Sequence, residues 1–131
     1  MTISLGRIDH IVLTVCDIDK TIQFYRDVLG MNEITFGDKR KALQFGNQKI
    51  NLHPESSEIS PKAKHPATGA MDICFITLSP IANVIDDLRK LNINIELGPV
   101  QRQGAQGNMT SVYIRDPDEN LIEIAHYNDE R

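Results

Sequence analysis

The order strand, helix and three strands occurs twice along this chain, and that repetition limits the folds that it can adopt. Each half opens with an apolar stretch rich in β-branched residues, continues with a helix of amphipathic pattern and ends with three short strand candidates. Aligning the halves places His10 on Asp72 and Leu29 on Leu91. A repeat that cannot bury one face of its own sheet packs against its copy. We therefore predict an α+β fold in which two βαβββ modules form a curved mixed sheet cup with the helices outside.

The first module, about residues 5–54, carries clear boundary signals. Asp17 and Asp19 offer oxygens that can cap the start of a helix, and Gly30 is placed to end that helix. Residues 37–40 and 46–47 indicate turns between strands. The predicted elements are a strand at 7–15, a helix at 20–29, and strands at 32–36, 41–45 and 49–53.

The second module, about residues 71–128, follows a polar linker at 55–70 that contains prolines and serines. This linker is either a plain connector or a lid over a binding site. Pro80 is placed in the first turn of a helix, and residues 116–120 form a strong hairpin-turn sequence. The predicted elements are a strand at 71–78, a helix from 79–80 to about 91, a short strand at 94–97, a mobile loop at 98–108, and strands at 110–115 and 121–127.

Composition excludes several classes of function. The 131 residues suffice for a single domain, and the net charge of −4, without a basic stripe, argues against nucleic-acid binding. No apolar run approaches the ~20 residues that span a membrane, and no secretory signal is visible. Cys16 and Cys74 lie in or beside apolar strands, which predicts buried, reduced thiols of a cytoplasmic protein. Cys74 as a nucleophile stays an alternative, although nothing near it in sequence identifies a base.

Four polar residues occupy equivalent positions in the two modules: His10, Asn51, Asp72 and Glu123. Each is flanked by apolar residues in its strand, and each should face the concave side of the predicted cup. Carboxylates in an apolar cup are costly unless they are paired or bind a metal, so a shared cation would offset that cost. The alternative for His10 is a core or edge histidine held by a hydrogen bond.

Two terminal motifs carry a family resemblance. Residues 9–15, followed by 24–31, resemble the start of vicinal oxygen chelate proteins, which include glyoxalase I, fosfomycin and bleomycin resistance proteins and extradiol dioxygenases. Residues 116–123, Asp-Pro-Asp-Glu-Asn-Leu-Ile-Glu, resemble the closing Asp-Pro-Asp-Gly-Asn-x-x-Glu of that superfamily. Residues 40–53 are similar to glyoxalase domain-containing protein 5 and its bacterial, virulence-associated relatives. The resemblance spans nearly all of residues 1–131 and implies one domain with a glyoxalase-like fold.

The resemblance implies a metal site. His10 and Glu123 match the first and last ligands of the family, while Asp72 stands where a histidine is usual and Asn51 stands where the glyoxalase branch has a glutamate. We expect one divalent metal, Zn, Ni, Mn, Mg or Fe, bound by His10, Asp72 and Glu123. The residues expected around the substrate are Asn51, His53, Tyr113, Val12 and Cys74; His53 is equally compatible with the surface, and Tyr113 with a buried hydroxyl that already has a partner.

The resemblance also implies a reaction. We expect a metal-dependent lyase or isomerase of the glyoxalase I type that acts on a small vicinal-oxygen substrate through an enediolate. Glu123 is the first candidate to move the proton between carbons, and Asp72 is the second. Glutathione as co-substrate stays open, with Arg40, Arg102 and Arg115 available for its carboxylates.

Two other functions are compatible with these residues. The missing second histidine favours a ligand-sequestering module, with or without a metal, as in bleomycin resistance. It also weakens the extradiol dioxygenase alternative, in which two imidazoles and a carboxylate hold iron. Because paired modules of this family often come from two chains, we expect a homodimer with a small-molecule substrate.

Overall fold

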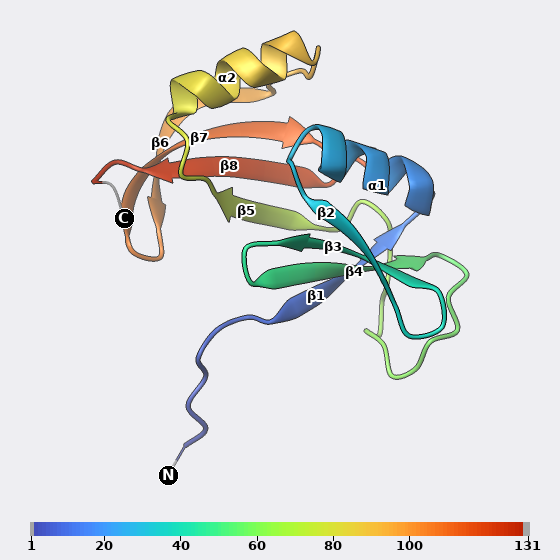
Figure 1. Ribbon diagram of the computed structural model, residues 1–131. Coiled ribbons are helices and arrows are strands. Elements are labelled where there is room, and N and C mark those ends of the chain that lie inside the picture. The colour runs from blue at the N-terminus through green and yellow to red at the C-terminus, as the bar shows by residue number, and fades with distance from the viewer. Residues whose placement is uncertain (1, 130–131) are drawn as a thin grey trace. The chain divides into compact units, whose positions relative to one another are not determined.

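The structure, a computed structural model, describes residues 2–129 and separates into two compact units, Met1–Thr68 and Gly69–Arg131. Each unit contains one four-stranded sheet and one helix (Figure 1). The predicted α+β fold of two βαβββ modules is confirmed by this element order. Both helices have ten residues, and in the described part of the chain none is long and apolar enough to cross a membrane.

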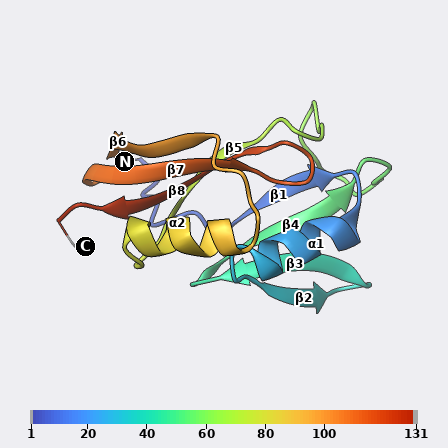
Figure 2. The ribbon, with the colours of Figure 1, turned by 90° about the horizontal axis from the view of Figure 1, so that it is seen from above.

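The first unit is a mixed sheet in the order β1-β4-β3-β2. Strand β1 pairs with β4 in parallel, while β4 with β3 and β3 with β2 are antiparallel. The elements are β1 (His10–Val15), α1 (Ile18–Asp27), β2 (Asn32–Phe36), β3 (Arg40–Phe45) and β4 (Gln48–Pro54). Helix α1 lies against β2, β3 and β4, and Figure 2 shows it along one face of the sheet. The opposite face of this sheet has no helix of its own unit on it.

The core of the first unit follows from strand alternation. Leu13, Leu52 and Leu43 are buried side chains of β1, β4 and β3 that share one face of the sheet by register. Ile22 and Tyr25 are the buried apolar residues of α1. Helix α1 begins two residues earlier than predicted because Asp17 is its N-cap and accepts a hydrogen bond from the Lys20 backbone N–H at 3.0 Å.

The second unit repeats the topology with the order β5-β8-β7-β6, in which β5 and β8 are parallel. Its elements are β5 (Asp72–Ile76), α2 (Ile81–Lys90), β6 (Leu97–Gly104), β7 (Gly107–Arg115) and β8 (Leu121–Tyr127). Val112, Ile114 and Ile122 are fully buried on the sheet, and Leu88 is buried on α2, which contacts β7. Each unit thus has its own apolar layer between helix and sheet.

Two predictions about the second unit are wrong. Residues 94–96 are not in a strand, and Leu97 is the first residue of β6. Residues 98–108 are not a loop, because they supply most of β6, a two-residue turn and the start of β7. The polar run at 101–103 hid the strand, because β6 is an edge strand with a single neighbour and needs few apolar residues. Pro99 falls at the register shift between Leu97 and Val100, where a strand tolerates a missing N–H.

Gly98 fixes the entry into β6. Its φ of +123° is a conformation that L side chains rarely adopt, and a Cβ there would lie 2.7 Å from the Ser111 carbonyl oxygen and 2.9 Å from the Val112 Cα. Both neighbours are backbone atoms of β7, which cannot move without disturbing the sheet.

We predict that Gly98→Ala lowers the free energy of unfolding by about 2 kcal/mol or more, because it adds backbone strain to a steric clash. Urea denaturation followed by circular dichroism measures this as a lower midpoint at unchanged slope. The control is Gly6→Ala, where a Cβ meets nothing within 4 Å. Equal midpoints for the two variants would contradict the prediction.

Candidate functional site

In the first unit, the helix-free face carries three of the predicted polar residues, His10, Asn51 and His53. The parallel register places Val12 beside Asn51 and Thr14 beside His53, so His10 and Asn51 share a face by strand alternation. On β3, Ala42 lies opposite Asn51 and continues the same face. The sequence prediction that His10, Val12, Asn51 and His53 point to one side therefore agrees with the register of the sheet.

His10 is held by its neighbour in sequence. Its Nδ1 lies 2.8 Å from Asp9 Oδ2, and since a carboxylate oxygen can only accept, Nδ1 donates. This hydrogen bond is the main cause that lowers the pKa of Asp9. In the neutral imidazole, Nε2 is therefore the nitrogen that carries the lone pair, which is the arrangement that metal-binding histidines adopt.

Asn51 lies at the centre of this face and is 5% exposed. Its side-chain oxygen, Oδ1, is buried and has no hydrogen-bond partner among the described residues. An unsatisfied buried acceptor costs about 1–3 kcal/mol. Such an atom is a site where a ligand can supply the missing donor.

His53 is buried, at 7% exposed, so the surface alternative for this residue is wrong. The guanidinium nitrogen Nη2 of Arg40 lies 3.4 Å from His53 Nε2. Burial, followed by the charges of Arg40 and Lys62, lowers the pKa of His53 from its ordinary 6.5. At neutral pH this imidazole is uncharged and lies among cations.

In the second unit, the helix-free face carries two carboxyl groups together with arginine side chains. Cys74 on β5 and Tyr113 on β7 are the register neighbours of Glu123 on β8, and Asp72 lies two residues before Cys74 on the same face. Glu123 Oε2 is buried without a hydrogen-bond partner among the described residues. Glu123 is therefore the second position where a buried acceptor lacks its donor.

Cys74 and Cys16 are free thiols, as expected, but both residues are exposed, which corrects the prediction that they are buried. Although Cys74 is exposed as a whole, partial burial of its thiol and the neighbouring Glu123, which accepts a hydrogen bond from it, raise the Cys74 pKa to about 12. The thiol is protonated at neutral pH. This argues against the alternative in which Cys74 is a nucleophile.

Tyr113 is half-buried and its hydroxyl accepts a hydrogen bond from Arg102 Nε at 2.9 Å. The same guanidinium lies 5.5 Å from the centre of the Tyr113 ring. Of the three arginines considered for substrate carboxylates, Arg115 is occupied, because it forms two hydrogen bonds of 2.9 and 3.0 Å with Glu96. Arg102 is engaged with Tyr113, and Arg40 lies beside His53.

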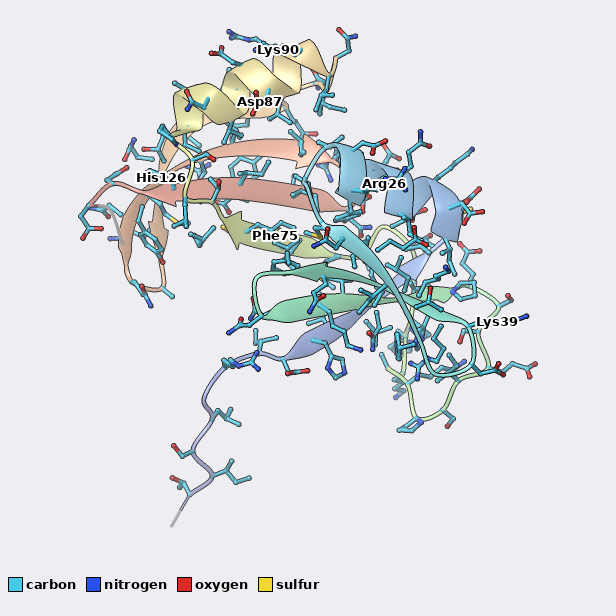
Figure 3. All side chains as sticks on the ribbon, viewed as in Figure 1. Arg26, Lys39, Phe75, Asp87, Lys90 and His126 are labelled. Atoms are coloured by element: carbon cyan, nitrogen blue, oxygen red, sulfur yellow. The ribbon has the colours of Figure 1, made fainter. Side chains whose placement is uncertain are left out.

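His126 of β8 does not belong to either of these faces. Its Nδ1 lies 3.0 Å from the Thr77 carbonyl oxygen, to which it donates (Figure 3). By strand alternation it lies on the opposite face of the sheet from Glu123. It is a structural histidine that connects β8 to the residue following β5.

The turn between β7 and β8 contains a buried network that sequence reasoning missed. Asp116 Oδ1 accepts from the backbone N–H groups of Asp118 and Asn120, both at 2.9 Å, and Asp116 Oδ2 accepts from Asn120 Nδ2 at 2.9 Å. Asn120 Oδ1 in turn accepts from the Met71 backbone N–H at 2.8 Å. The turn therefore fixes where β5 begins beside β8, and with it Asp72 and Glu123. The signal was present in Asp and Asn at turn positions, whose side chains bond to nearby backbone.

The predicted metal ligands come from both halves of the chain: His10 from the first unit, Asp72 and Glu123 from the second. In neither unit, over residues 2–129, do three or more His, Cys, Asp or Glu side chains gather in a group that could hold a metal. The three-ligand site therefore stays a prediction that needs residues of both units.

Comparison with known proteins gives consistent results. Residues 7–124 match the family model described as Glyoxalase/Bleomycin resistance protein/Dioxygenase superfamily. The chain is 54% identical to virulence protein STM3117 of Salmonella typhimurium, over 94% of this chain and 85% of that protein. The crystal structure of STM3117 matches with a TM-score of 0.94, covering 95% of this chain and 99% of that one.

Two further relatives carry glyoxalase names. Glyoxalase domain-containing protein RDO1 of Mycosarcoma maydis is 48% identical, over 97% of this chain and 72% of that protein. The crystal structure of a lactoylglutathione lyase from Agrobacterium tumefaciens matches with a TM-score of 0.73 at 27% identity, covering 94% of this chain and 95% of that one.

We predict that His53 makes the protein less stable in weak acid. Its pKa is lower in the folded than in the unfolded chain, so the unfolded chain binds more protons below pH 6.5 and stability falls as pH decreases through this window. Urea midpoints measured from pH 7.5 to 5.5 should fall less steeply for His53→Gln than for the unchanged protein. His65→Gln, at an exposed linker position, is the control and should keep the original slope. A His53→Gln profile parallel to the original would contradict the prediction.

Proposed function

Because the chain belongs to the glyoxalase/bleomycin resistance protein/dioxygenase superfamily, we propose that it is a metal-dependent lyase or isomerase of the glyoxalase I type. Its substrate would be a small molecule with two neighbouring oxygen atoms. The observation that carries the proposal is Glu123, whose Oε2 is buried without a partner on the helix-free face of the second unit. The similarity to a lactoylglutathione lyase supports the same reaction class.

The proposed metal ligands are His10, Asp72 and Glu123. They fit a divalent cation, because the Asp9 hydrogen bond leaves His10 Nε2 free and because Glu123 Oε2 lacks any other partner. One nitrogen and carboxylate oxygens suit Zn, Ni, Mn, Mg or Fe in the divalent state. A cation bound there would hold the two substrate oxygens and offset negative charge that develops on them.

The chain's own residues supply the proton transfer. Glu123 would carry the proton between the two substrate carbons, and Asp72 is the second candidate. Cys74 donates a hydrogen bond to the carboxyl group of Glu123, which helps to hold that side chain in place. Tyr113 lies opposite Glu123 in the register and can orient a substrate oxygen.

We predict that Glu123→Gln, which keeps the shape of the side chain and removes its charge, weakens divalent-metal binding by about 100-fold or more. The chelator-treated protein is titrated with Zn²⁺, Ni²⁺, Mn²⁺, Mg²⁺ and, without oxygen, Fe²⁺ by calorimetry. Turnover of methylglyoxal with glutathione is then measured for each reloaded form. Turnover should be lost together with metal binding.

The matched control is Glu119→Gln, at an exposed turn position four residues earlier. It should bind metal and turn over substrate like the unchanged protein. Absence of metal uptake by the unchanged protein would overturn the enzyme proposal. Metal uptake without turnover of any vicinal-oxygen substrate would favour the ligand-sequestering alternative.

We further propose a homodimer. Strands β1 and β5 are edge strands, and they or the residues just after them expose apolar side chains: Val12 is 44%, Ile76 49% and Leu78 82% exposed. Exposed apolar side chains along sheet edges favour association. Sedimentation analysis at micromolar concentration should give twice the chain mass of 14.7 kDa. A monomer under these conditions would remove this proposal, and Leu78→Ser should shift the equilibrium toward the monomer.

A further inference from the structure

The helix-free face of the first unit is concave. Lys49 on β4 and Phe36 on β2 are separated by one intervening strand and by four residues of register, which puts their Cα atoms roughly 16 Å apart in a flat sheet. Nevertheless, the Lys49 ammonium lies 3.8 Å from the centre of the Phe36 ring. The sheet must therefore curl toward this face, and Ala42, which lies between the two on β3, is fully buried.

Two cations converge on this concave face. The Arg40 guanidinium carbon lies 4.8 Å from the centre of the same Phe36 ring that Lys49 contacts. Neither Arg40 nor Lys49 forms an ion pair with a carboxylate anywhere in residues 2–129, whereas Lys41, on the opposite face, is paired with Glu33 at 3.0 Å. Neither of these two cations therefore has a carboxylate at ion-pair distance in the described part of the chain, and Lys49 interacts at longer range with the carboxylate of Asp9.

Between these cations lies the unsatisfied acceptor. Asn51 lies opposite Ala42 in the register and is only 5% exposed. Its Oδ1 atom has no hydrogen-bond partner among the described residues. The face therefore combines two features that a single ligand can satisfy. It attracts negative charge, and it needs one hydrogen-bond donor.

We propose that this concave face binds a small hydroxycarboxylate, with its carboxylate at Arg40 and Lys49 and its hydroxyl donating to Asn51 Oδ1. The ligand class follows from the pairing: the two cations require an anionic group, and the Asn51 oxygen requires a donor close to that group. An acetate-like carboxylate lacks the hydroxyl, and the dianion of a phosphate monoester lacks the donor. Inorganic phosphate still carries a P–OH group at neutral pH, so it is included among the comparison ligands of the test. The identification of this ligand as the substrate rests on the proposed function, and the substrate would then be a small hydroxycarboxylate.

The test uses the full chain after chelator treatment, so that binding is measured without any metal. Glycolate is the probe, and acetate, methyl glycolate and inorganic phosphate are the comparison ligands. Titrations are followed by nitrogen–proton NMR at the Asn51 side-chain amide and the Arg40 Nε–H. We expect saturable shifts with glycolate, about fivefold weaker binding of acetate, and no binding of the uncharged ester.

Variants then separate the two parts of the recognition. Arg40→Gln and Lys49→Gln should each weaken glycolate binding by about tenfold, since each removes one charge-assisted hydrogen bond. Asn51→Leu should abolish the preference for glycolate over acetate. The control is Lys39→Asn, which removes a positive charge next in sequence to Arg40 from an exposed turn position (Figure 3). Urea denaturation checks that every variant is fully folded at the temperature of the binding measurement. Arg40→Lys, which keeps the positive charge, should recover part of the affinity.

The proposal would be overturned if methyl glycolate bound as tightly as glycolate. It would also be overturned if phosphate bound more tightly than glycolate and Asn51→Leu left phosphate affinity unchanged. A loss of glycolate affinity in Lys39→Asn as large as that in Arg40→Gln would overturn it as well. Glycolate binding with no metal uptake would overturn the proposed function and leave this inference standing. Metal uptake and turnover in a protein that does not bind glycolate would support the proposed function and overturn this inference.

Discussion

Parallel pairing between the first and last strands of each unit is the constraint on which the candidate sites depend. It sets Val12 beside Asn51 in one unit and Cys74 beside Glu123 in the other, although these residues are far apart in sequence. Since side chains alternate between faces, a slip of one residue in either register would move every polar group to the helix side. The apolar layers beneath α1 and α2 oppose that slip, because it would expose buried side chains to water.

The two units share a topology but differ in the chemistry of their helix-free faces. The first presents Arg40, Lys49 and a buried amide, while the second presents carboxyl groups and a protonated thiol. Each face keeps one buried acceptor without a donor, Asn51 Oδ1 and Glu123 Oε2. A fold does not determine a function, and here the repeated scaffold has acquired two different surfaces. Unsatisfied acceptors at equivalent positions are the common element between them.

Local signals in the sequence predicted most of the elements correctly, and their failures have physical causes. Alternation and turn residues located β2 and β8 at their observed bounds. Buried and partly exposed residues alternate along most of β8, and β2 is followed directly by the turn at 37–39. Strand β6 was missed because an edge strand with polar residues has no alternation to detect. The exposure of both cysteines was predicted wrongly, and the burial of His53 was left undecided. The burial of each of these side chains depends on neighbours from other strands and the linker, which no local pattern shows.

The duplicated βαβββ order, the family and the set of polar residues that share a face can be read from the amino-acid sequence, since they follow from periodicity, turn chemistry and terminal motifs. Which of those residues lack hydrogen-bond partners becomes visible only in the folded molecule. The contact between Lys49 and Phe36 and the unsatisfied Asn51 Oδ1 appear only in the folded sheet, and the turn network at Asp116 sets the start of β5. Such contacts join residues that no local pattern links, because sheet curvature and register are properties of several strands together.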